Sequence, residues 1–239
     1  MTIYQKYFTS GEKHIAVLLD PDKLTVEKTA HYGSIIENSP ASMIFIGGSL
    51  VNKDIEKTIE ILKNETQKPV VIFPGSGSQF SDKADALLFL SLISGRNPEY
   101  LIGEQVKTAY KIKKSGIETI PTGYVLIDGG TVTSVQYVSN TMPIPSDKTD
   151  LAVSTAIAGE LLGLKCFYLE AGSGAKFHVK KEIISAVKQN VSSPIIVGGG
   201  IRSIETVSEL FSSGADIAVI GTAFENNPDF FKTSRNVLV

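Results

Sequence analysis

Two aspartates and a serine offer the oxygen ligands that a Mg²⁺ ion requires. Asp20 and Asp22 flank Pro21 at the end of the first apolar run, and Ser49 follows two glycines at the end of the second. Carboxylates in such positions suit a hard divalent cation, which takes oxygen ligands and often bridges to the phosphates of a substrate. The same aspartates are also ordinary turn chemistry, in which Asp20 would cap a turn. These residues alone leave a metal site and a simple turn as two open interpretations.

An acid and a phenol share one face of a later apolar run. Alternation places the side chains of Tyr168 and Glu170 on one side and that of Leu169 on the other. A carboxylate is costly to bury without a partner, which favours a functional role for Glu170 over a core position neutralised by a lysine. The segment Gly172–Gly174, with a serine between its glycines, is a candidate anion-binding nest.

Glycines also follow the last two apolar runs. Gly199 and Gly200 come after the seventh run and before a helical pattern, and Gly221 and Thr222 come directly after the eighth. Backbone N–H groups at glycines can approach an anion closely, and a helix N-terminus adds positive partial charge, so such loops make a phosphate cradle. A glycine at a strand end can also be a steric necessity. Glycines after two successive strands favour a phosphate site.

Eight apolar runs, rich in Val and Ile, alternate with segments of helical periodicity along the chain. This alternation is typical of parallel strands joined by helices, and eight units in 239 residues predict a closed (β/α)8 barrel, the TIM barrel. No linker divides the sequence, so we expect one domain over residues 1–239. The predicted strands are His14–Asp20, Met43–Gly48, Pro69–Phe73, Ala86–Leu92, Thr119–Ile127, Cys166–Glu170, Pro194–Gly198 and Asp216–Gly221. Active sites of this fold lie at the carboxyl ends of the strands, where the residues singled out above stand.

Two segments depart from the regular repeat. The connection over residues 74–85 is too short and too rich in Gly and Ser for an ordinary helix with its two loops, so the helix after strand three should be missing or irregular. This gap is either a harmless truncation or the opening of an apolar groove along the barrel wall. Thr131–Val138 alternates after two glycines and predicts a small extra hairpin.

Composition and charge exclude several classes of protein. The net charge of −2 and the lack of a basic cluster argue against nucleic acid as a partner. No apolar run approaches the roughly 20 residues of a membrane span, and residues 1–13 lack the apolar core of a signal peptide. Cys166 is the only cysteine, which rules out an intramolecular disulfide and favours a reducing compartment. We therefore expect a soluble, cytoplasmic protein.

Together these motifs, in this order along nearly the whole chain, resemble the geranylgeranylglyceryl phosphate synthase family, which includes the bacterial heptaprenylglyceryl phosphate synthases. The resemblance is to the second, partly bacterial branch. It implies a modified TIM barrel without a regular third helix. It also implies a Mg²⁺-dependent prenyltransferase that joins a polyprenyl diphosphate, here expected to be geranylgeranyl, to the sn-3 hydroxyl of sn-glycerol 1-phosphate and releases diphosphate. Since the family forms dimers and hexamers, a homodimer or homohexamer is expected.

The resemblance also assigns roles to residues of this chain. It implies that Asp20 and Ser49 bind Mg²⁺, and that Glu170 orients or deprotonates the attacking hydroxyl, so that Asp20 and Glu170 are the expected catalytic residues. The prenyl tail would run along the groove left by the missing helix. The residues implied to hold glycerol 1-phosphate are Tyr168, Leu169, Glu170, Ala171, Gly172, Ser173, Gly174, Gly199, Gly200, Gly221 and Thr222.

Two residues depart from the pattern of the archaeal members. Leu18 stands where some members carry a lysine, and Thr222 stands where some carry an asparagine. These departures leave open which side chains complete the phosphate and diphosphate sites, and whether Asp22 shares the metal.

Two other functions fit the same fold. One is a phosphate-binding isomerase or lyase of amino-acid biosynthesis, in which Asp20 and Glu170 would act as the acid and base pair. The other is a non-catalytic barrel that binds phosphate metabolites, in which both carboxylates would be dispensable.

Overall fold

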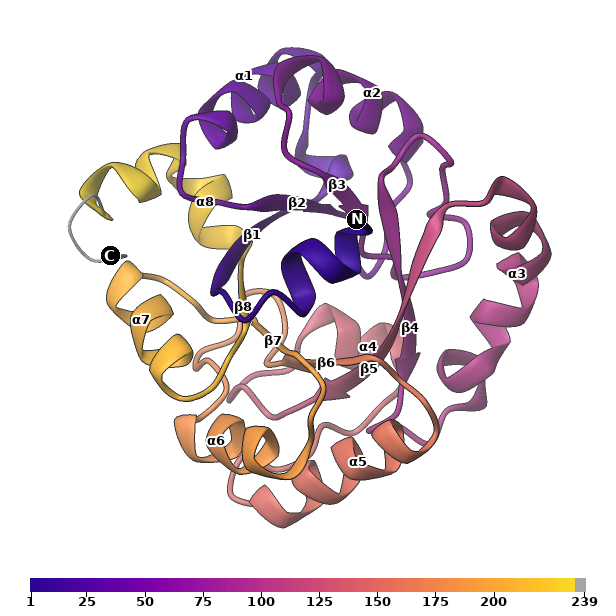
Figure 1. Cartoon of the computed structure of the whole chain (residues 1–239), viewed down its shortest axis with the longest axis vertical. Helices are drawn as coiled ribbons and strands as arrows, with labels where there is room; N and C mark the ends of the chain where they lie inside the picture. Colours follow the sequence, from indigo (N-terminus) through magenta and orange to yellow (C-terminus); the bar gives the residue numbers. More distant parts are fainter. Residues whose placement is uncertain (235–239) are drawn as a thin grey trace.

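Eight parallel strands close into a barrel in the computed structural model, which describes residues 1–234 (Figure 1). Each strand pairs with the next along the chain, and β8 closes the barrel against β1, with His14 opposite Ile217. The strands are β1 (His14–Leu19), β2 (Met43–Ile46), β3 (Val70–Ile72), β4 (Ala86–Leu92), β5 (Glu118–Leu126), β6 (Cys166–Glu170), β7 (Ile195–Gly198) and β8 (Ile217–Ile220). The predicted (β/α)8 barrel is confirmed. Of the segment 1–239 expected to form one domain, residues 235–239 lie outside the described part.

Alternate side chains of each strand enter two separate hydrophobic clusters. Along β1, Ala16 and Leu18 belong to the cluster inside the barrel, whereas Val17 packs between the sheet and the outer helices. Along β6, Tyr168 faces the interior and Leu169 the helices. The strand alternation expected from the sequence thus decides which side chains can reach the inside of the barrel.

Helices surround most of the barrel (Figure 1). α2 buries Ile55, Ile59 and Leu62, the apolar stripe that predicted it. Thr25 and Ser203 cap the first turns of α1 and α7 with their side-chain oxygens. The α-helices are α1 (Val26–Glu37), α2 (Ile55–Glu65), α3 (Glu104–Ser115), α4 (Ser134–Ser139), α5 (Thr149–Leu161), α6 (Lys181–Asn190), α7 (Ile204–Ser212) and α8 (Thr222–Asn226); shorter turns of other helix types are η1 (Tyr4–Phe8), η2 (Pro21–Lys23), η3 (Glu99–Gly103) and η4 (Pro228–Ser234).

Residues 73–85, all of them described, connect β3 to β4 without a helix. The buried side chain of Gln79 holds this loop in place of helix packing. Its Nε2 donates to the Gly48 carbonyl at 2.8 Å, and its Oε1 accepts from the N–H groups of Gly48 and Gly75, each at 3.2 Å. Gly75 lies so close to the loop after β2 that a Cβ there would stand 2.8 Å from the Cα of Ser49. The missing helix predicted from the sequence is confirmed, and a hydrogen-bonded loop replaces it.

The hairpin predicted over Thr131–Val138 is wrong, because most of this segment belongs to the short helix α4, Ser134–Ser139. The N–H of Tyr137 donates to the Thr133 carbonyl at 3.0 Å, and Asn140 ends the helix with a φ of 48°. None of the eight strands of the described chain pairs with this segment, and the helix lets Val135 pack on the interior cluster at the mouth of the barrel. Tertiary packing therefore overrides the period-two pattern.

The N-terminal segment covers one end of the barrel. η1 crosses the barrel in Figure 1, and Phe8 packs into the interior cluster. The Glu118 carboxylate accepts from the backbone N–H groups of Ile3 at 2.7 Å and Tyr4 at 2.8 Å, which ties this segment to β5. The carboxyl ends of the strands lie at the opposite end. None of the helices in residues 1–234 combines the length and the hydropathy that a membrane span requires.

Candidate functional site

A cavity opens at the carboxyl ends of the strands. Most of the residues singled out in the sequence line it, and they come from the ends of five different strands or from the segments that follow them: Asp20, Ser49, Tyr168, Glu170, Ser173, Gly174, Gly199, Gly200, Gly221 and Thr222. Three of the expected substrate-binding residues do not line it. Leu169 and Ala171 pack among the outer helices, and Gly172 instead donates its N–H to Glu170. The barrel therefore brings most of the sequence-predicted site into one chamber.

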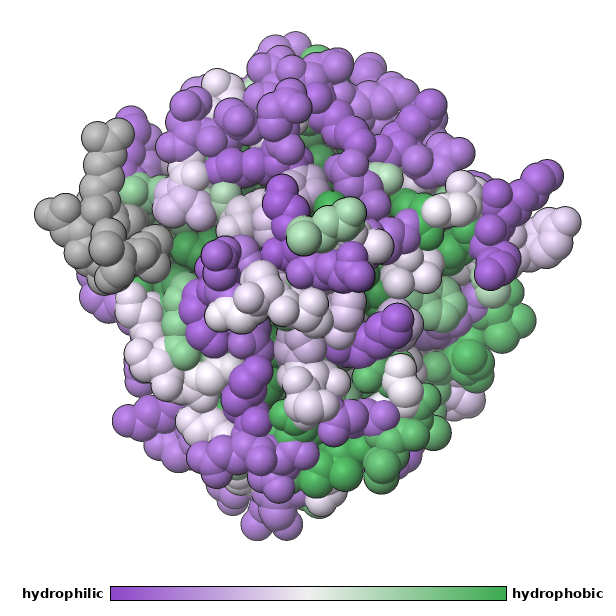
Figure 2. Space-filling model, viewed as in Figure 1, coloured by the Kyte–Doolittle hydropathy of each residue, from purple (hydrophilic) through white to green (hydrophobic). Residues whose placement is uncertain are grey.

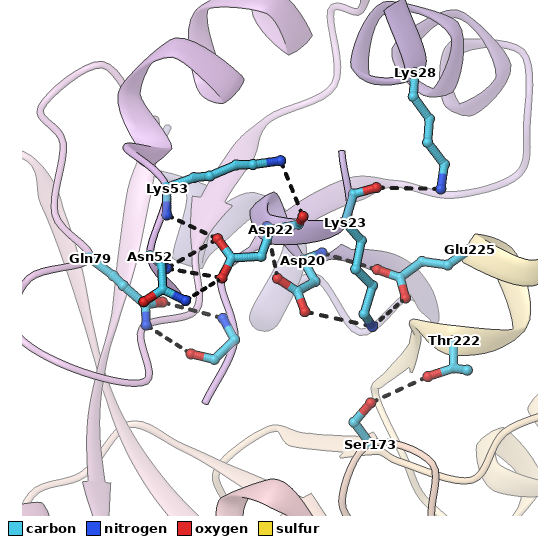
Figure 3. Close-up of polar contacts among 11 residues, drawn as sticks. Asp20, Asp22, Lys23, Lys28, Asn52, Lys53, Gln79, Ser173, Thr222 and Glu225 are labelled. Atoms are coloured by element: carbon cyan, nitrogen blue, oxygen red, sulfur yellow. Dashed lines mark hydrogen bonds and ion pairs between the residues drawn. The ribbon is translucent and has the colours of Figure 1, made fainter. Parts of the chain in front are cut away.

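Asp20 caps η2 and also faces this chamber (Figure 3). Its Oδ1 accepts from the Asp22 N–H at 3.1 Å, while its Oδ2 lies 3.6 Å from the ammonium of Lys23. Glu225, from α8, accepts the backbone N–H of Asp20 at 3.1 Å with Oε1 and contacts Lys23 at 2.8 Å with Oε2. Burial lowers the pKa of Lys23, but the carboxylates of Glu225 and Asp20 outweigh it and hold that pKa above its usual 10.5. Asp20 therefore both caps the turn η2 and presents its carboxylate to the cavity.

The donor set around Asp20 fits a Mg²⁺ ion that is shared with a substrate. Gly48 lies against the carboxylate, since a Cβ at that position would be 3.6 Å from Asp20 Oδ1, and Ser49 follows it on the cavity wall. Within residues 1–234, no group of three or more His, Cys, Asp or Glu side chains is placed to hold a metal. Mg²⁺ is commonly bound by one or two carboxylates, with water and substrate phosphates supplying the remaining oxygens. One carboxylate and one hydroxyl therefore suit a phosphate-bridging ion rather than a closed structural site.

Asp22 points away from the cavity into the loop that follows β2 (Figure 3). Its carboxylate accepts from the backbone N–H groups of Asn52 and Lys53, each at about 3 Å, and from the Asn52 amide. These hydrogen bonds, with the Lys53 N–H first, hold the pKa of Asp22 below its usual 3.8. The Lys53 ammonium in turn donates a hydrogen bond to the Asp22 backbone carbonyl at 3.1 Å. Asp22 is therefore committed to joining two loops.

Glu170 is a buried carboxylate at the end of β6, facing into the chamber. Burial raises its pKa to about 7, while the Gly172 N–H and the phenols of Tyr168 and Tyr124 oppose this rise. The Gly172 N–H donates to its Oε1 at 2.5 Å. Opposite it stands Gly199, where φ is +81° and a Cβ would lie 2.5 Å from the same oxygen. A carboxylate with this pKa exchanges a proton near neutral pH, as a general base must.

An aromatic cluster of Phe73, Tyr124 and Tyr168 lies beside Glu170. Phe73 stacks on Tyr168 with ring centroids 4.9 Å apart, and Tyr124 lies 5.4 Å from Tyr168. The Tyr168 hydroxyl is buried and has no hydrogen-bond partner of normal geometry among the described residues. Phe73 and Tyr124 were not singled out from the sequence, although both line the cavity. The sequence did contain signals for both residues: Phe73 comes directly after β3, and Tyr124 lies at an inward-facing position of β5.

Three loops converge on the far side of the chamber to make a small polar pocket. The hydroxyls of Ser173 and Thr222 lie 3.3 Å apart, which brings the loops after β6 and β8 together (Figure 3). Gly200, with a φ of +71°, approaches the backbone N of His178 so closely that a Cβ would lie 2.8 Å away. Arg202 ties the loops after β6 and β7 by donating to the carbonyls of Ala175 and Lys176, at 2.9 and 3.0 Å. Small, positive-φ residues thus leave room for an anion beside backbone N–H groups.

An apolar groove meets the chamber where the third helix is missing. Its walls include Leu88 and Leu90 of β4, Ile112 of α3 and Phe80 of the helix-free loop. The Lys111 ammonium covers the Phe80 ring at 4.8 Å from its centroid. Five residues line both the groove and the polar chamber: Gly48, Ser49, Phe73, Tyr124 and Val135. Of the two interpretations of the gap, the structure supports the groove.

Cys166 and His14 take no part in this site. The Cys166 thiol is inside the barrel beside the Thr122 hydroxyl at 3.2 Å, and burial raises its pKa to about 12, which leaves it protonated and unreactive. His14 lies at the opposite end of β1 between the hydroxyls of Ser10 and Ser42, at 3.1 and 3.0 Å.

Comparison with known proteins gives consistent matches over nearly the whole chain. The sequence model of the PcrB family matches residues 8–237. A protein of Flavobacterium johnsoniae named geranylgeranylglyceryl phosphate synthase is 53% identical and covers 96% of both chains, and one of the same name from Chitinophaga pinensis is 51% identical over 93% of this chain and 88% of its own. The crystal structure of (S)-3-O-geranylgeranylglyceryl phosphate synthase from Thermoplasma acidophilum, in complex with sn-glycerol-1-phosphate, is 35% identical, with a TM-score of 0.90 over 97% of this chain and 95% of that one. The tryptophan synthase α-subunit of Pyrococcus furiosus, at 13% identity and a TM-score of 0.56, shares the fold alone.

The contacts of Asp22 predict a structural role that is separable from metal binding. We expect Asp22→Ala to lower the free energy of unfolding by about 1 kcal/mol, since two backbone N–H groups lose their acceptor. The stabilisation is present above pH 3.8, the usual pKa, and is lost as the pH falls toward the lower pKa of the folded state. Urea unfolding at pH 7 and pH 3 measures it, with the exposed Asp82→Ala as control. A loss of Mg²⁺ affinity at unchanged stability would instead make Asp22 a metal ligand.

Proposed function

The chain belongs to the PcrB family, and we propose that it transfers a polyprenyl group, geranylgeranyl or one of similar length, to the sn-3 hydroxyl of sn-glycerol 1-phosphate with Mg²⁺ as cofactor. The observation that carries this proposal is the junction of two unlike cavities. A polar chamber with anion-binding loops opens directly into an apolar groove, and both are lined by Ser49 and Tyr124. Such a junction suits a reaction between a small phosphate and an apolar diphosphate.

The glycerol 1-phosphate would lie between the loops after β6, β7 and β8. Its phosphate fits the polar pocket of Ser173, Gly200 and Thr222, where backbone N–H groups and hydroxyls are available. The glycerol carbons would then point toward Glu170, the carboxylate that β6 contributes to the wall of the chamber. The T. acidophilum relative was crystallised with the same small molecule, which supports this assignment.

The prenyl diphosphate would place its tail in the groove and its charged end beside Asp20 and Ser49. The tail is apolar, so its transfer from water into the groove is favourable in proportion to the area buried. When bound there, Mg²⁺ supplies positive charge that stabilises the departing diphosphate. The protein residues of this region position the donor so that its first carbon lies at the junction, next to the acceptor hydroxyl.

The chemical step needs one base and no covalent intermediate. The bond between the allylic carbon and the diphosphate oxygen breaks, and its electron pair leaves with the diphosphate. The glycerol hydroxyl oxygen forms a new bond to that carbon, and its proton passes to the ionised carboxylate of Glu170. The phenols of Tyr124 and Tyr168, whose pKa values burial raises well above 10, stay protonated and line the path between base and groove.

The assay that tests the proposal uses labelled sn-glycerol 1-phosphate with prenyl diphosphates from C10 to C35. We expect label in the organic phase with Mg²⁺ and none with EDTA, and a fall of about 100-fold or more in kcat/KM for Asp20→Asn, which loses the charge that holds the metal. The conservative variant keeps the η2 cap, and circular dichroism checks its fold. No organic label from folded wild-type protein with any donor would sink the proposal and leave the isomerase or binding-barrel functions.

The pKa of Glu170 predicts the pH dependence of the reaction. Because burial raises it to about 7, the base is protonated at lower pH, and we expect kcat/KM to rise with pH and level off above about 7. Glu170→Gln should lower kcat/KM by about 10²- to 10⁴-fold and remove the rise.

The pKa of Glu170 can also be tested without substrate, through the pH dependence of the free energy of unfolding. The free energy of unfolding should fall as pH increases from about 4.5 to 7. The reason is that the pKa of Glu170 is raised in the folded state, so the unfolded chain gives up this proton first. Glu170→Gln should flatten this part of the stability profile measured by urea unfolding. An unchanged stability profile, or activity that persists at pH 5, would contradict the assigned pKa and role.

Exposed apolar residues gather on one side of the molecule, over α3 and α5 (Figure 2). α5 buries Ala152 and Ala156 on one face, yet Leu161 on another face and Leu162 just beyond its end are more than 80% exposed. A patch of exposed apolar side chains on a folded protein commonly marks a surface that another protein covers. We propose that this surface, with Val106 on α3, is the interface between copies of the chain in a homodimer or homohexamer.

Multi-angle light scattering checks the assembly. We expect a mass of two or six times 25.7 kDa, and we expect Leu161→Lys to shift it toward the single chain because a charge would be buried in the interface. Val26→Lys is the matched control, since Val26 is an exposed apolar residue of α1, outside this surface. A wild-type mass of 25.7 kDa at assay concentration would refute the proposed assembly.

A further inference from the structure

Among the described residues that line the polar chamber, two carry a positive charge, Lys23 and Arg202. The Arg202 guanidinium donates to the backbone carbonyls of Ala175 and Lys176 in the loop after β6, on the side of the pocket assigned to glycerol phosphate. Leu18, the last inward residue of β1, is apolar. The side of the chamber that contains Asp20 and Ser49 therefore has one cation, Lys23, to meet an anionic ligand.

Lys23 is held in position rather than free to move. Its ammonium lies 2.8 Å from Glu225 Oε2 and 3.6 Å from Asp20 Oδ2, in the arrangement drawn in Figure 3. Glu225 is itself fixed: its side chain is 7% exposed, its other oxygen accepts the Asp20 N–H, and its carbonyl accepts the Tyr32 hydroxyl at 2.9 Å. An ammonium has three donors, and only one of them is used in the hydrogen bond to Glu225, so Lys23 keeps donors for a ligand of the chamber that it lines.

The charges of this cluster suit a ligand that arrives with a divalent cation. Asp20, Lys23 and Glu225 together carry one net negative charge, which would repel a bare diphosphate. A Mg²⁺ ion held by Asp20 would give the site a net positive charge, and the Lys23 ammonium would add a hydrogen-bond donor for the diphosphate. A fixed ammonium of this kind stabilises charge that develops on a leaving group, because it needs no reorganisation during the step.

We propose that Lys23 binds the diphosphate of the prenyl donor beside the metal position at Asp20, and that Glu225 is the positioning residue that keeps the Lys23 ammonium there. This inference rests on the proposed function, in which the diphosphate lies on the Asp20 side of the chamber. It makes Lys23 a catalytic residue, since its ammonium contacts the leaving group, whereas Glu225 acts through Lys23.

Calorimetric binding of inorganic pyrophosphate with saturating Mg²⁺ tests the site without turnover. We expect Lys23→Met to raise the Kd for pyrophosphate about 10- to 100-fold, the loss of one charge-assisted hydrogen bond. Lys23→Gln, which can still donate to Glu225, should show the same loss with the fold preserved. Lys28→Met is the matched control, because Lys28 donates to the Lys23 carbonyl at 3.5 Å from outside the chamber and should leave the Kd unchanged (Figure 3).

Kinetics and a double-mutant cycle separate positioning from general structure. With prenyl diphosphate varied, Lys23→Met should lower kcat/KM about 100-fold while the KM for glycerol 1-phosphate stays that of the wild type. Glu225→Gln keeps the acceptor for the Asp20 N–H but loses the charge, and should weaken pyrophosphate binding less than Lys23→Met does. On the Lys23→Met background it should cause no further loss, because it acts through Lys23.

The outcomes distinguish this inference from the proposed function. An active wild-type enzyme whose pyrophosphate affinity is the same in Lys23→Met and Lys23→Gln would overturn the role of Lys23. Independent, multiplicative losses in the double variant would overturn the role of Glu225. A wild-type protein that makes no prenylated product, yet binds Mg²⁺ and pyrophosphate through Lys23, would overturn the proposed function and leave the anion site standing.

Discussion

The burial of one carboxylate constrains the rest of the site. Glu170 ends β6 inside the barrel, where an ionised acid is costly, and the surrounding groups reduce that cost only partly. The Gly172 N–H donates to it at 2.5 Å, and Tyr124 and Tyr168 place phenols near it, so its pKa is left near neutrality instead of at that of an exposed glutamate. The backbone must also make room for it. A side chain at Gly199 would occupy the same space, and φ is +81° there.

The second constraint is the junction between the polar chamber and the apolar groove. A helix after β3 would cover this wall, and the chain instead places a loop there that is fixed by the buried amide of Gln79. Asp22 fixes the neighbouring loop in the same way, with its carboxylate on backbone N–H groups. The junction at Ser49 and Phe73 is therefore rigid without helix packing. A rigid junction suits a transfer in which two unlike substrates must meet at one carbon.

Barrel closure supplies the third feature, the cluster of Asp20, Lys23 and Glu225. Glu225 follows β8 and lies some two hundred residues from Asp20 in the sequence, yet β8 pairs with β1 and brings α8 against the first turn. Charges that are far apart along the chain thus become direct neighbours. The barrel places the cavity-facing Asp20 at the end of one strand and Glu225, which accepts the Asp20 N–H and pairs with Lys23, just after the neighbouring strand.

The sequence alone determined the features that depend on local pattern. Apolar runs and helical periodicity predicted the eight strands and the closed barrel, the Gly and Ser content of residues 74–85 predicted the missing helix, and alternation predicted that Tyr168 and Glu170 point inward. The resemblance of the motifs then predicted the family. Local pattern failed at Thr131–Val138, where alternation indicated a hairpin and packing at the barrel mouth makes a helix instead.

Only the tertiary structure decided the features that depend on contacts between distant segments. The partners of Lys23, the loop-joining role of Asp22 and the aromatic neighbours of Glu170 arise from contacts between segments that are up to some two hundred residues apart. Leu169 was expected at the substrate but faces the helices, since alternation that turns Glu170 inward turns its neighbour outward. A side chain's type and spacing fix what it can do, whereas its pKa and its free donors depend on the groups that the fold places around it.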